Sequence, residues 1–209
     1  VLSFRELMER TLAYADRNKY VADPEFVPLP GGSPEAMIAP DYLRERAALI
    51  DPGRSMGEAQ PGDLGPVPLG LGPQPPEHGT SHISVVDRYG NAAAMTTTVE
   101  SAFGSFHMTD GVLLNNQLTD FSAEPVDEEG LPVANRVEPG KRPRSSMAPT
   151  LVFERTPDGG RGDIRMVVGS PGGSVIIQFV VKTLVNTLDW GLDPQQAVSA
   201  VSFGAGNSP

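Results

Sequence analysis

Cysteine is absent from this chain, which excludes disulfides, thiolate nucleophiles and cysteine metal sites. Basic residues are also few: the chain has 16 lysine and arginine residues and 26 acidic residues, which gives a formal net charge of −10. That balance argues against nucleic acid or an anionic membrane as the main partner. The chain also lacks any run of about 18 apolar residues, so the sequence predicts no membrane-spanning helix.

The 209 residues are enough for one good-sized domain with a buried core. The first residues lack the initiator methionine, basic start and apolar centre of a signal peptide. The last residues, 203–209, have the composition of a loop and follow directly on a helical pattern. We therefore expect both ends to be cuts through a longer protein.

Glycine and proline are concentrated in one segment, where they make up 14 of the 29 residues from 51 to 79. Such a segment forms neither a helix nor a central strand, so we expect it to lie on the surface or to be flexible, and exposed backbone of this kind is easily cut. An ordinary interdomain linker is the alternative. Upstream, Ser3 and Glu6 form a capping-box pattern for a helix to about Asn18, and a shorter helix is expected near 41–49.

The sequence beyond residue 80 has the alternating pattern of strands. Strands are predicted at about 82–87 and up to about 99, joined by a turn at 88–91, and a third at 112–114. Another pair is expected at 150–153 and 164–168. Dense apolar residues predict a buried helix over 174–188, and a capping pattern at 193–196 starts a last one. Strands followed by helices indicate an α+β fold.

Thr80 stands where the glycine- and proline-rich segment changes into the first strand. If the Gly79–Thr80 bond were cut, the new α-amine of Thr80 could act as base for its own hydroxyl. On these residues alone, the simple start of a strand is the favoured interpretation. Thr98 lies at the far end of the returning strand, where antiparallel pairing would bring its hydroxyl beside that of Thr80. Three threonines at 96–98 that merely favour a strand are the alternative.

The glycine-rich residues 169–174 leave a strand and enter a helix. Backbone amides at such a bend point outward together, which suits a phosphate or a developing oxyanion. The segment lacks the Gly-Lys-Ser/Thr ending of a phosphate loop, so nucleotide binding is not expected. A tight connection without a ligand remains an alternative of equal weight.

Two polar segments, 115–120 and 142–147, together offer acceptors for an amine and donors for a carboxylate. An amino-acid head group requires both. Solvated turns are the alternative for each segment. His82, His107 and Glu154 lack the spacing of metal ligands, so no metal site is predicted.

Taken together, these segments resemble the γ-glutamyltranspeptidases (glutathione hydrolases), a family of N-terminal-nucleophile hydrolases. The matching residues occur in the family's order over nearly the whole chain: Tyr14-Ala15-Asp16-Arg17, Asp23-Pro24, Thr80-Ser81-His82, Ser84-Val85-Val86-Asp87, Gly90-Asn91, Leu113-Leu114-Asn115-Asn116-Gln117, Asp120-Phe121-Ser122, Lys141-Arg142-Pro143, Ser145-Ser146-Met147 and Gly169-Ser170-Pro171-Gly172-Gly173-Ser174.

The resemblance implies part of a four-layer αββα sandwich and a precursor that cuts itself between Gly79 and Thr80. Residues 1–79 would be the C-terminal part of a large subunit that ends in the glycine- and proline-rich linker. Residues 80–209 would be the N-terminal part, and most, of a small catalytic subunit. Thr80 would be the nucleophile, Thr98 would orient its hydroxyl, and the amides of Gly172 and Gly173 would hold the oxyanion.

The resemblance also implies the substrate contacts. Gln117 and Asp120 would hold the α-amine of a γ-glutamyl substrate, and Ser145 and Ser146 its α-carboxylate. Glu100 is a further expected substrate contact, at a position where many members carry asparagine. The implied partners are glutathione or other γ-glutamyl compounds, water or amino-acid and peptide acceptors, and the two subunits themselves. No cofactor is implied.

Alternatives remain for the function and for the location. An acylase for glutaryl or cephalosporin side chains, or a non-catalytic relative, are the alternative functions. Members are often periplasmic or extracellular, with the cytoplasm as the alternative. The segment between Ser122 and Lys141 is shorter than in members with a lid, which implies a more open site. We expect the 209-residue chain alone to be inactive, because the family's arginine for the α-carboxylate lies upstream of it and further strands lie downstream.

Overall fold

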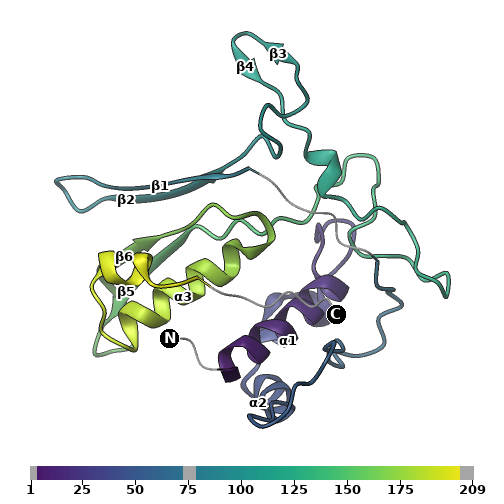
Figure 1. Ribbon diagram of the computed structural model, residues 1–209, viewed down its shortest axis with the longest axis horizontal. Coiled ribbons are helices and arrows are strands. Elements are labelled where there is room, and N and C mark those ends of the chain that lie inside the picture. Colours follow the sequence, from purple (N-terminus) through teal and green to yellow (C-terminus); the bar gives the residue numbers. More distant parts are fainter. Residues whose placement is uncertain (1–3, 73–78, 203–209) are drawn as a thin grey trace. The chain divides into compact units, whose positions relative to one another are not determined.

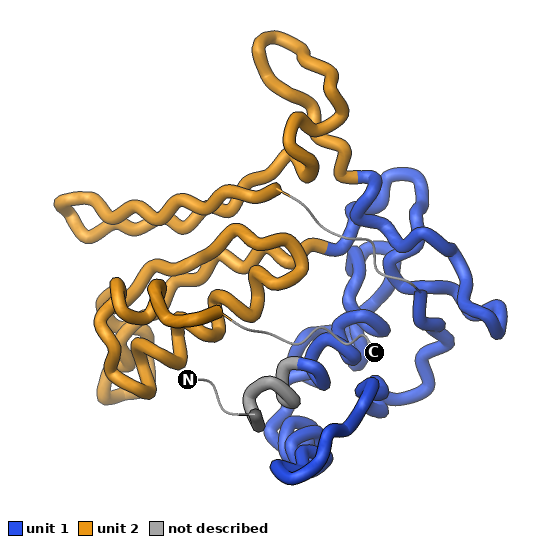
Figure 2. The backbone as a smooth tube through the Cα atoms, in the orientation of Figure 1, with its two compact units in different colours: residues 1–75, 118–144, 203–209 blue, residues 76–117, 145–202 orange. Residues whose placement is uncertain are grey.

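The computed structural model describes residues 4–72 and 79–202, without the side chains of residues 4–10 (Figure 1). The chain divides into two compact units (Figure 2). Unit 1 comprises residues 1–75, 118–144 and 203–209, and unit 2 comprises residues 76–117 and 145–202. The capping box predicted at Ser3 and Glu6 and the loop-like end at 203–209 lie outside the described parts.

Unit 1 is built on two helices, α1 (Phe4–Tyr20) and α2 (Pro40–Ala48). Both helices were predicted, although α1 continues two residues past Asn18. Two short 3₁₀ turns, η1 (Pro30–Gly32) and η2 (Pro34–Ile38), precede α2. Leu12 and Ala15 of α1 form a small core with Ala59. None of the helices in the described part of the chain is long and apolar enough to cross a membrane.

The carboxylate of Asp16 organises the polar interior of unit 1. It accepts hydrogen bonds from the hydroxyl of Tyr42 at 2.8 Å, the Nη2 of Arg46 at 3.0 Å and the backbone amide of Gly62 at 2.7 Å. Tyr20 donates in turn to the carbonyl oxygen of Gly62 at 2.7 Å. Burial, and then the hydrogen bond to Asp16, raise the pKa of Tyr42. These hydrogen bonds link α1 and α2 to Gly62, which lies in the glycine- and proline-rich segment 51–79 that was expected to be exposed.

The expectation that all of residues 51–79 lie on the surface is therefore wrong for part of that segment. Ala59, Gly62 and Gly70 are buried, and Gly70 pairs with Val133 in an isolated parallel β-bridge. Proline and glycine prevent regular structure here, but they do not prevent single backbone groups from finding partners across the unit. Residues 73–78 lie outside the described parts.

The described residues of unit 2 form three antiparallel hairpins, each a separate two-stranded sheet. All five predicted strands are confirmed, with small shifts at their ends. β3 was missed because two residues are too few to show an alternating pattern. The strands are β1 (Ser81–Val86) with β2 (Ala92–Thr97), β3 (Met108–Thr109) with β4 (Val112–Leu113), and β5 (Thr150–Arg155) with β6 (Arg161–Val168).

The layers of unit 2 follow from the hairpins and the helices. β2 lies close to β5 and β6, while α3 (Ile176–Leu188) covers β5 and β6 and packs Ile176 and Val180 against Val168 (Figure 1). α4 (Pro194–Ser199) follows, and its predicted capping box is confirmed: Asp193 accepts from the amide of Gln196 at 2.8 Å. The unit is thus a mixture of helix and sheet, as the α+β pattern predicted.

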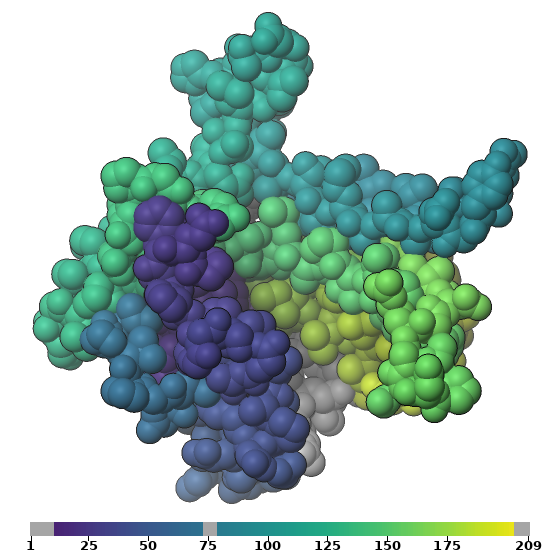
Figure 3. All heavy atoms as spheres, turned by 180° about the vertical axis from the view of Figure 1, so that it is seen from behind, coloured from purple at the N-terminus to yellow at the C-terminus, as the bar shows by residue number. Residues whose placement is uncertain are grey.

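The β1–β2 hairpin projects from the rest of its unit (Figure 3). Its apolar face is open, because Ile83 is 47%, Val85 52% and Met95 52% exposed. The opposite face carries His82 and Thr96, which are half-buried. The more exposed face of this hairpin is therefore the apolar one.

Candidate active site

The junction between Gly79 and Thr80 lies directly before β1. Within the hairpin Ser81 pairs with Thr97 and His82 with Thr96, and continuation of this register sets Thr80 opposite Thr98. The hydroxyl of Thr98 donates a hydrogen bond to the carbonyl oxygen of Gly79 and accepts one from the amide of Glu100 at 2.7 Å. A hydroxyl has one proton to donate. In the uncut chain that proton goes to Gly79 rather than to the hydroxyl of Thr80.

Gly79 is fixed closely against the residue that follows the returning strand. Its φ is +65°, in the left-handed region, and a Cβ added there would lie 2.6 Å from the carbonyl oxygen of Glu100. Glu100 has a left-handed φ of 75° as well. Two such conformations in contact make the junction a constrained piece of backbone. Only glycine fits at position 79 without a shift of its neighbours.

Glu100 is buried, with 4% of its surface exposed. Its Oε2 accepts hydrogen bonds from the hydroxyl of Ser101 at 2.9 Å and from the side-chain amide of Asn116. Asn116 also accepts from the amide of Ser101 at 3.0 Å. The sequence placed Asn116 in a polar segment but gave no signal that it contacts Glu100, since 16 positions separate them. The carboxylate is thus held in one orientation.

Gln117 and Asp120 lie at the two ends of a short turn, η3 (Gln117–Asp120). Asn115 accepts a hydrogen bond from the amide of Gln117 at 2.9 Å. Asp120 is buried, and its carbonyl oxygen accepts from the side chain of Asn135 at 2.8 Å. Gln117 belongs to unit 2 and Asp120 to unit 1.

Ser145 and Ser146 lie on an extended segment that leads to β5. The hydroxyl of Ser145 is exposed and accepts from the amide of Met147 at 3.1 Å, whereas Ser146 is buried. The two neighbouring serines therefore differ in burial. No pattern in the sequence indicated which of them would be buried.

The glycine-rich bend follows β6 and precedes α3, as predicted. Gly172 and Gly173 have φ values of 139° and 56°, and Gly173 begins the 3₁₀ turn η4 (Gly173–Val175). Gly169 packs on β1, since a Cβ added to it would lie 2.0 Å from Cε1 of the His82 ring. His82 is held by Thr96, whose hydroxyl lies 2.8 Å from its Nδ1. The start of β1 and the bend therefore lie side by side within unit 2.

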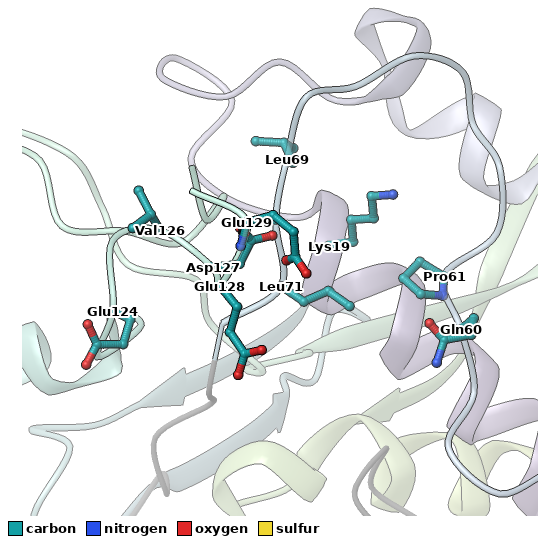
Figure 4. Close-up of a pocket in the computed structure, with 11 residues that line it drawn as sticks. Lys19, Gln60, Pro61, Leu69, Leu71, Glu124, Val126, Asp127, Glu128 and Glu129 are labelled. Atoms are coloured by element: carbon teal, nitrogen blue, oxygen red, sulfur yellow. Dashed lines mark hydrogen bonds between the residues drawn. The ribbon is translucent and has the colours of Figure 1, made fainter. Parts of the chain in front are cut away.

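Unit 1 has a hollow of about 780 Å³ on its surface, shown in Figure 4. None of the predicted site residues lines it. Among the described residues, no group of three or more histidine, aspartate or glutamate side chains is arranged to hold a metal ion. The hollow is lined by Lys19, Gln60, Pro61, Leu69, Gly70, Leu71, Glu124, Val126, Asp127, Glu128 and Glu129.

Comparison with known proteins identifies the family. Residues 4–209 match the family model described as gamma-glutamyltranspeptidase, and the chain belongs to this family. It is 39% identical over 203 residues to the glutathione hydrolase proenzyme of Escherichia coli (strain K12), and 39% identical over 197 residues to that of Bacillus subtilis (strain 168). These alignments cover 91% and 90% of this chain.

The chain spans only 31% of the length of each of these two curated relatives. Among solved structures, a mutant of the Helicobacter pylori gamma-glutamyltranspeptidase is 42% identical, with a TM-score of 0.48. That match covers 57% of this chain and 64% of the other.

Proposed function

We propose that the complete protein is a γ-glutamyl hydrolase and transferase that acts on glutathione and related γ-glutamyl amides. It would become active by cutting itself between Gly79 and Thr80, and would work through a threonine acyl-enzyme. The observation that carries the proposal is the hydrogen bond from Thr98 to the carbonyl oxygen of Gly79. Membership of the γ-glutamyltranspeptidase family, and the proenzyme names of the two relatives, support it.

Self-cleavage would begin with attack of the Thr80 hydroxyl on the carbonyl carbon of Gly79. The Thr98 hydroxyl would donate to the oxygen on which negative charge develops. The C–N bond then breaks as the amine of Thr80 takes up a proton, which leaves an ester between the two residues. Water hydrolyses the ester into a Gly79 carboxylate and a Thr80 with a free α-amine and a free hydroxyl. Residues 1–79 then belong to the large subunit and residues 80–209 to the small one.

In turnover, the α-amine of Thr80 would take the proton of its own hydroxyl, which attacks the γ-carbonyl carbon of the substrate. The amides of Gly172 and Gly173 would hold the resulting oxyanion, and the packing of Gly169 on His82 supports their place near Thr80. The leaving amine takes the proton. Water, or an amino-acid or peptide amine, then accepts the glutamyl group and restores the Thr80 hydroxyl.

The α-ammonium of the substrate would be held by Glu100, Gln117 and Asp120. The burial of Glu100 and Asp120 supports this role. A cation is attracted more strongly to a carboxylate that is shielded from water than to one that is exposed. Ser145 and Ser146 would donate to the α-carboxylate. Asn116 would keep Glu100 in its orientation through the hydrogen bond described above.

An acylase for glutaryl or cephalosporin side chains is the second candidate, on the same nucleophile. A glutaryl group has no amine, so the buried carboxylates favour the γ-glutamyl substrate. The test compares hydrolysis of γ-glutamyl and glutaryl anilides by the protein expressed from its complete gene. Faster release from the γ-glutamyl anilide is expected, and faster release from the glutaryl anilide would overturn the choice. An intact precursor without a fragment that begins at Thr80 would support a non-catalytic relative.

We also infer that the complete protein forms the four-layer αββα sandwich. The exposed Ile83, Val85 and Met95 support this inference, because their face of β1–β2 offers an apolar surface for a further layer. A periplasmic or extracellular location rests on the family resemblance alone. Fractionation of cells that express the complete gene tests it, with the cytoplasm as the alternative.

A further inference from the structure

Unit 1 is assembled from both sides of the proposed cut. Residues 11–72 precede Gly79, whereas residues 118–144, here called the arm, follow it. The two stretches are separate in sequence but interleave in one compact unit (Figure 2). Every contact between them is therefore a contact between the two products that cleavage would create.

The first such contact joins Asp23 to Arg142, 119 positions apart. Oδ2 of Asp23 accepts from both the backbone amide and the Nε of Arg142, and Oδ1 accepts from its Nη2, each at 2.9 Å. The Asp23 side chain is only 1% exposed. The hydrogen bonds from Arg142 hold the pKa of Asp23 well below its usual range. A bidentate pair with an added backbone donor is a strong and directional contact.

The second contact is made by Arg144, which is 5% exposed. Its Nη1 donates to the carbonyl oxygens of Arg17 and Asn18 at 3.2 Å each, and to that of Val21 at 3.5 Å. The carbonyls of Arg17 and Asn18 belong to the last turn of α1 (Phe4–Tyr20), and that of Val21 follows directly after it. The last carbonyls of a helix lack some of their intrahelical partners, although Arg17 also accepts from the amide of Val21 at 3.0 Å. The end of a helix also carries partial negative charge, which a guanidinium complements. Arg144 thus caps a helix of the other product.

The third contact continues along the arm into the glycine- and proline-rich segment. The amide of Gly70 donates to the carbonyl oxygen of Pro132 at 3.0 Å. Ala134 is fully buried in a cluster with Ala22 and Val27, against which Leu69 packs. The large-subunit tail is therefore held up to about Gly70, nine positions before Gly79 in the printed sequence.

We propose that the arm is the surface by which the small subunit retains the end of the large subunit after cleavage, with Arg142 and Arg144 as its principal contacts. Its partner surface is a helix C-terminus followed by a buried aspartate. The inference rests on the proposed cut between Gly79 and Thr80. Cleavage leaves all three contacts untouched, because none of their atoms belongs to the junction.

The test uses the protein expressed from its complete gene. After self-cleavage, the two chains are titrated with urea, and their separation is followed by size-exclusion chromatography. The double variant Arg142→Met with Arg144→Met should separate at a urea concentration lower by about 1 M, because it leaves the buried carboxylate of Asp23 without its cation and the end of α1 without its donor. The matched control is Arg44→Met with Arg54→Met, whose arginines pair with Asp41 and Asp51 on their own side of the cut.

The control should separate at the wild-type urea concentration, and equal midpoints for the arm variant and wild type would overturn the inference. If the double variant fails to fold, the single variants Asp23→Asn and Arg142→Gln take its place, and an unchanged midpoint in both has the same meaning. A Thr80→Ala background keeps the chain continuous, so the arm substitutions should release no fragment there.

Failure of self-cleavage is a separate result. In that case the two chains, split at the junction, are co-expressed from separate genes and purified through a tag on one of them. Co-purification that the arm variant weakens supports the inference even without self-cleavage. Wild-type chains that do not co-purify, or pairs that the arm variant leaves unchanged, contradict it.

Discussion

Thr98 offers the most direct test of the proposed self-cleavage. Its hydroxyl both donates to the carbonyl oxygen of Gly79 and accepts from the amide of Glu100. The substitution Thr98→Val removes the hydroxyl while it keeps the size and branching that a strand favours. Any effect on cleavage should therefore come from the lost hydrogen bonds rather than from a lost side chain.

The two lost hydrogen bonds have separable effects. Removal of one donor to a developing oxyanion slows an acyl transfer by about 10²–10³-fold, or roughly 3–4 kcal/mol in the barrier. Loss of the acceptor for the Glu100 amide leaves a buried N–H unpaired, which lowers the free energy of unfolding by about 1–3 kcal/mol. We thus expect a precursor that is folded but less stable, and that cleaves at least about 100-fold more slowly.

The assay is a pulse–chase in cell-free translation of the complete gene, with the fragments separated on a denaturing gel. Thr98→Ser keeps the hydroxyl and should cleave within a few-fold of wild type. Thr97→Val is the matched control, one position away on the same strand with an exposed side chain, and it should leave the rate unchanged. The reasoning fails if Thr98→Val cleaves at the wild-type rate, or if Thr97→Val slows cleavage equally.

Three further outcomes follow from the geometry. Gly79→Ala should block or strongly slow cleavage on the same gel assay, because its Cβ would lie 2.6 Å from the Glu100 carbonyl oxygen at a left-handed φ; an unimpaired rate would contradict this. Glu100→Gln should raise KM for a γ-glutamyl anilide at least about 10-fold, because a hydrogen bond to a charged group contributes about 1.5–3 kcal/mol. The lowered pKa of Asp23 means that its pairing with Arg142 stabilises the fold above a pH of about 4 and is lost as the pH falls further. The urea midpoints of wild type and Arg142→Gln should accordingly differ at pH 7 and converge in acid, and a gap that persists in acid would refute this.

Local signals in the sequence were sufficient for most of the secondary structure. The alternation from His82 onward predicted β1 and its partner, and the register of that hairpin is what sets Thr80 opposite Thr98. The pattern at Asp193 predicted a capping box that the structure contains. In each case the residues that specify the element lie within a few positions of one another, so a short stretch of sequence is enough to predict it.

Contacts between distant residues could not be predicted in this way. The carboxylate of Asp16 meets the amide of Gly62 across 46 positions, and Arg144 meets the carbonyl of Arg17 across 127. Glycine at position 62 signals only that regular structure is disfavoured, not that its amide is needed elsewhere. For the same reason, the composition of residues 51–79 predicted an exposed linker, while the structure buries Ala59, Gly62 and Gly70 of that segment.

In the proposed mechanism, the hydroxyl of Thr98 would act both in self-cleavage and in turnover. Before the cut, the proton of Thr98 is committed to the carbonyl oxygen of Gly79, and the left-handed Gly79 is pressed against Glu100. The proposed cut would free the Gly79 carbonyl from Thr80. The proton of Thr98 would then become available to the hydroxyl of Thr80, which continuation of the hairpin register sets opposite it. We therefore expect Thr98 to serve both reactions in turn, and a variant defective in cleavage but normal in turnover would separate the two roles.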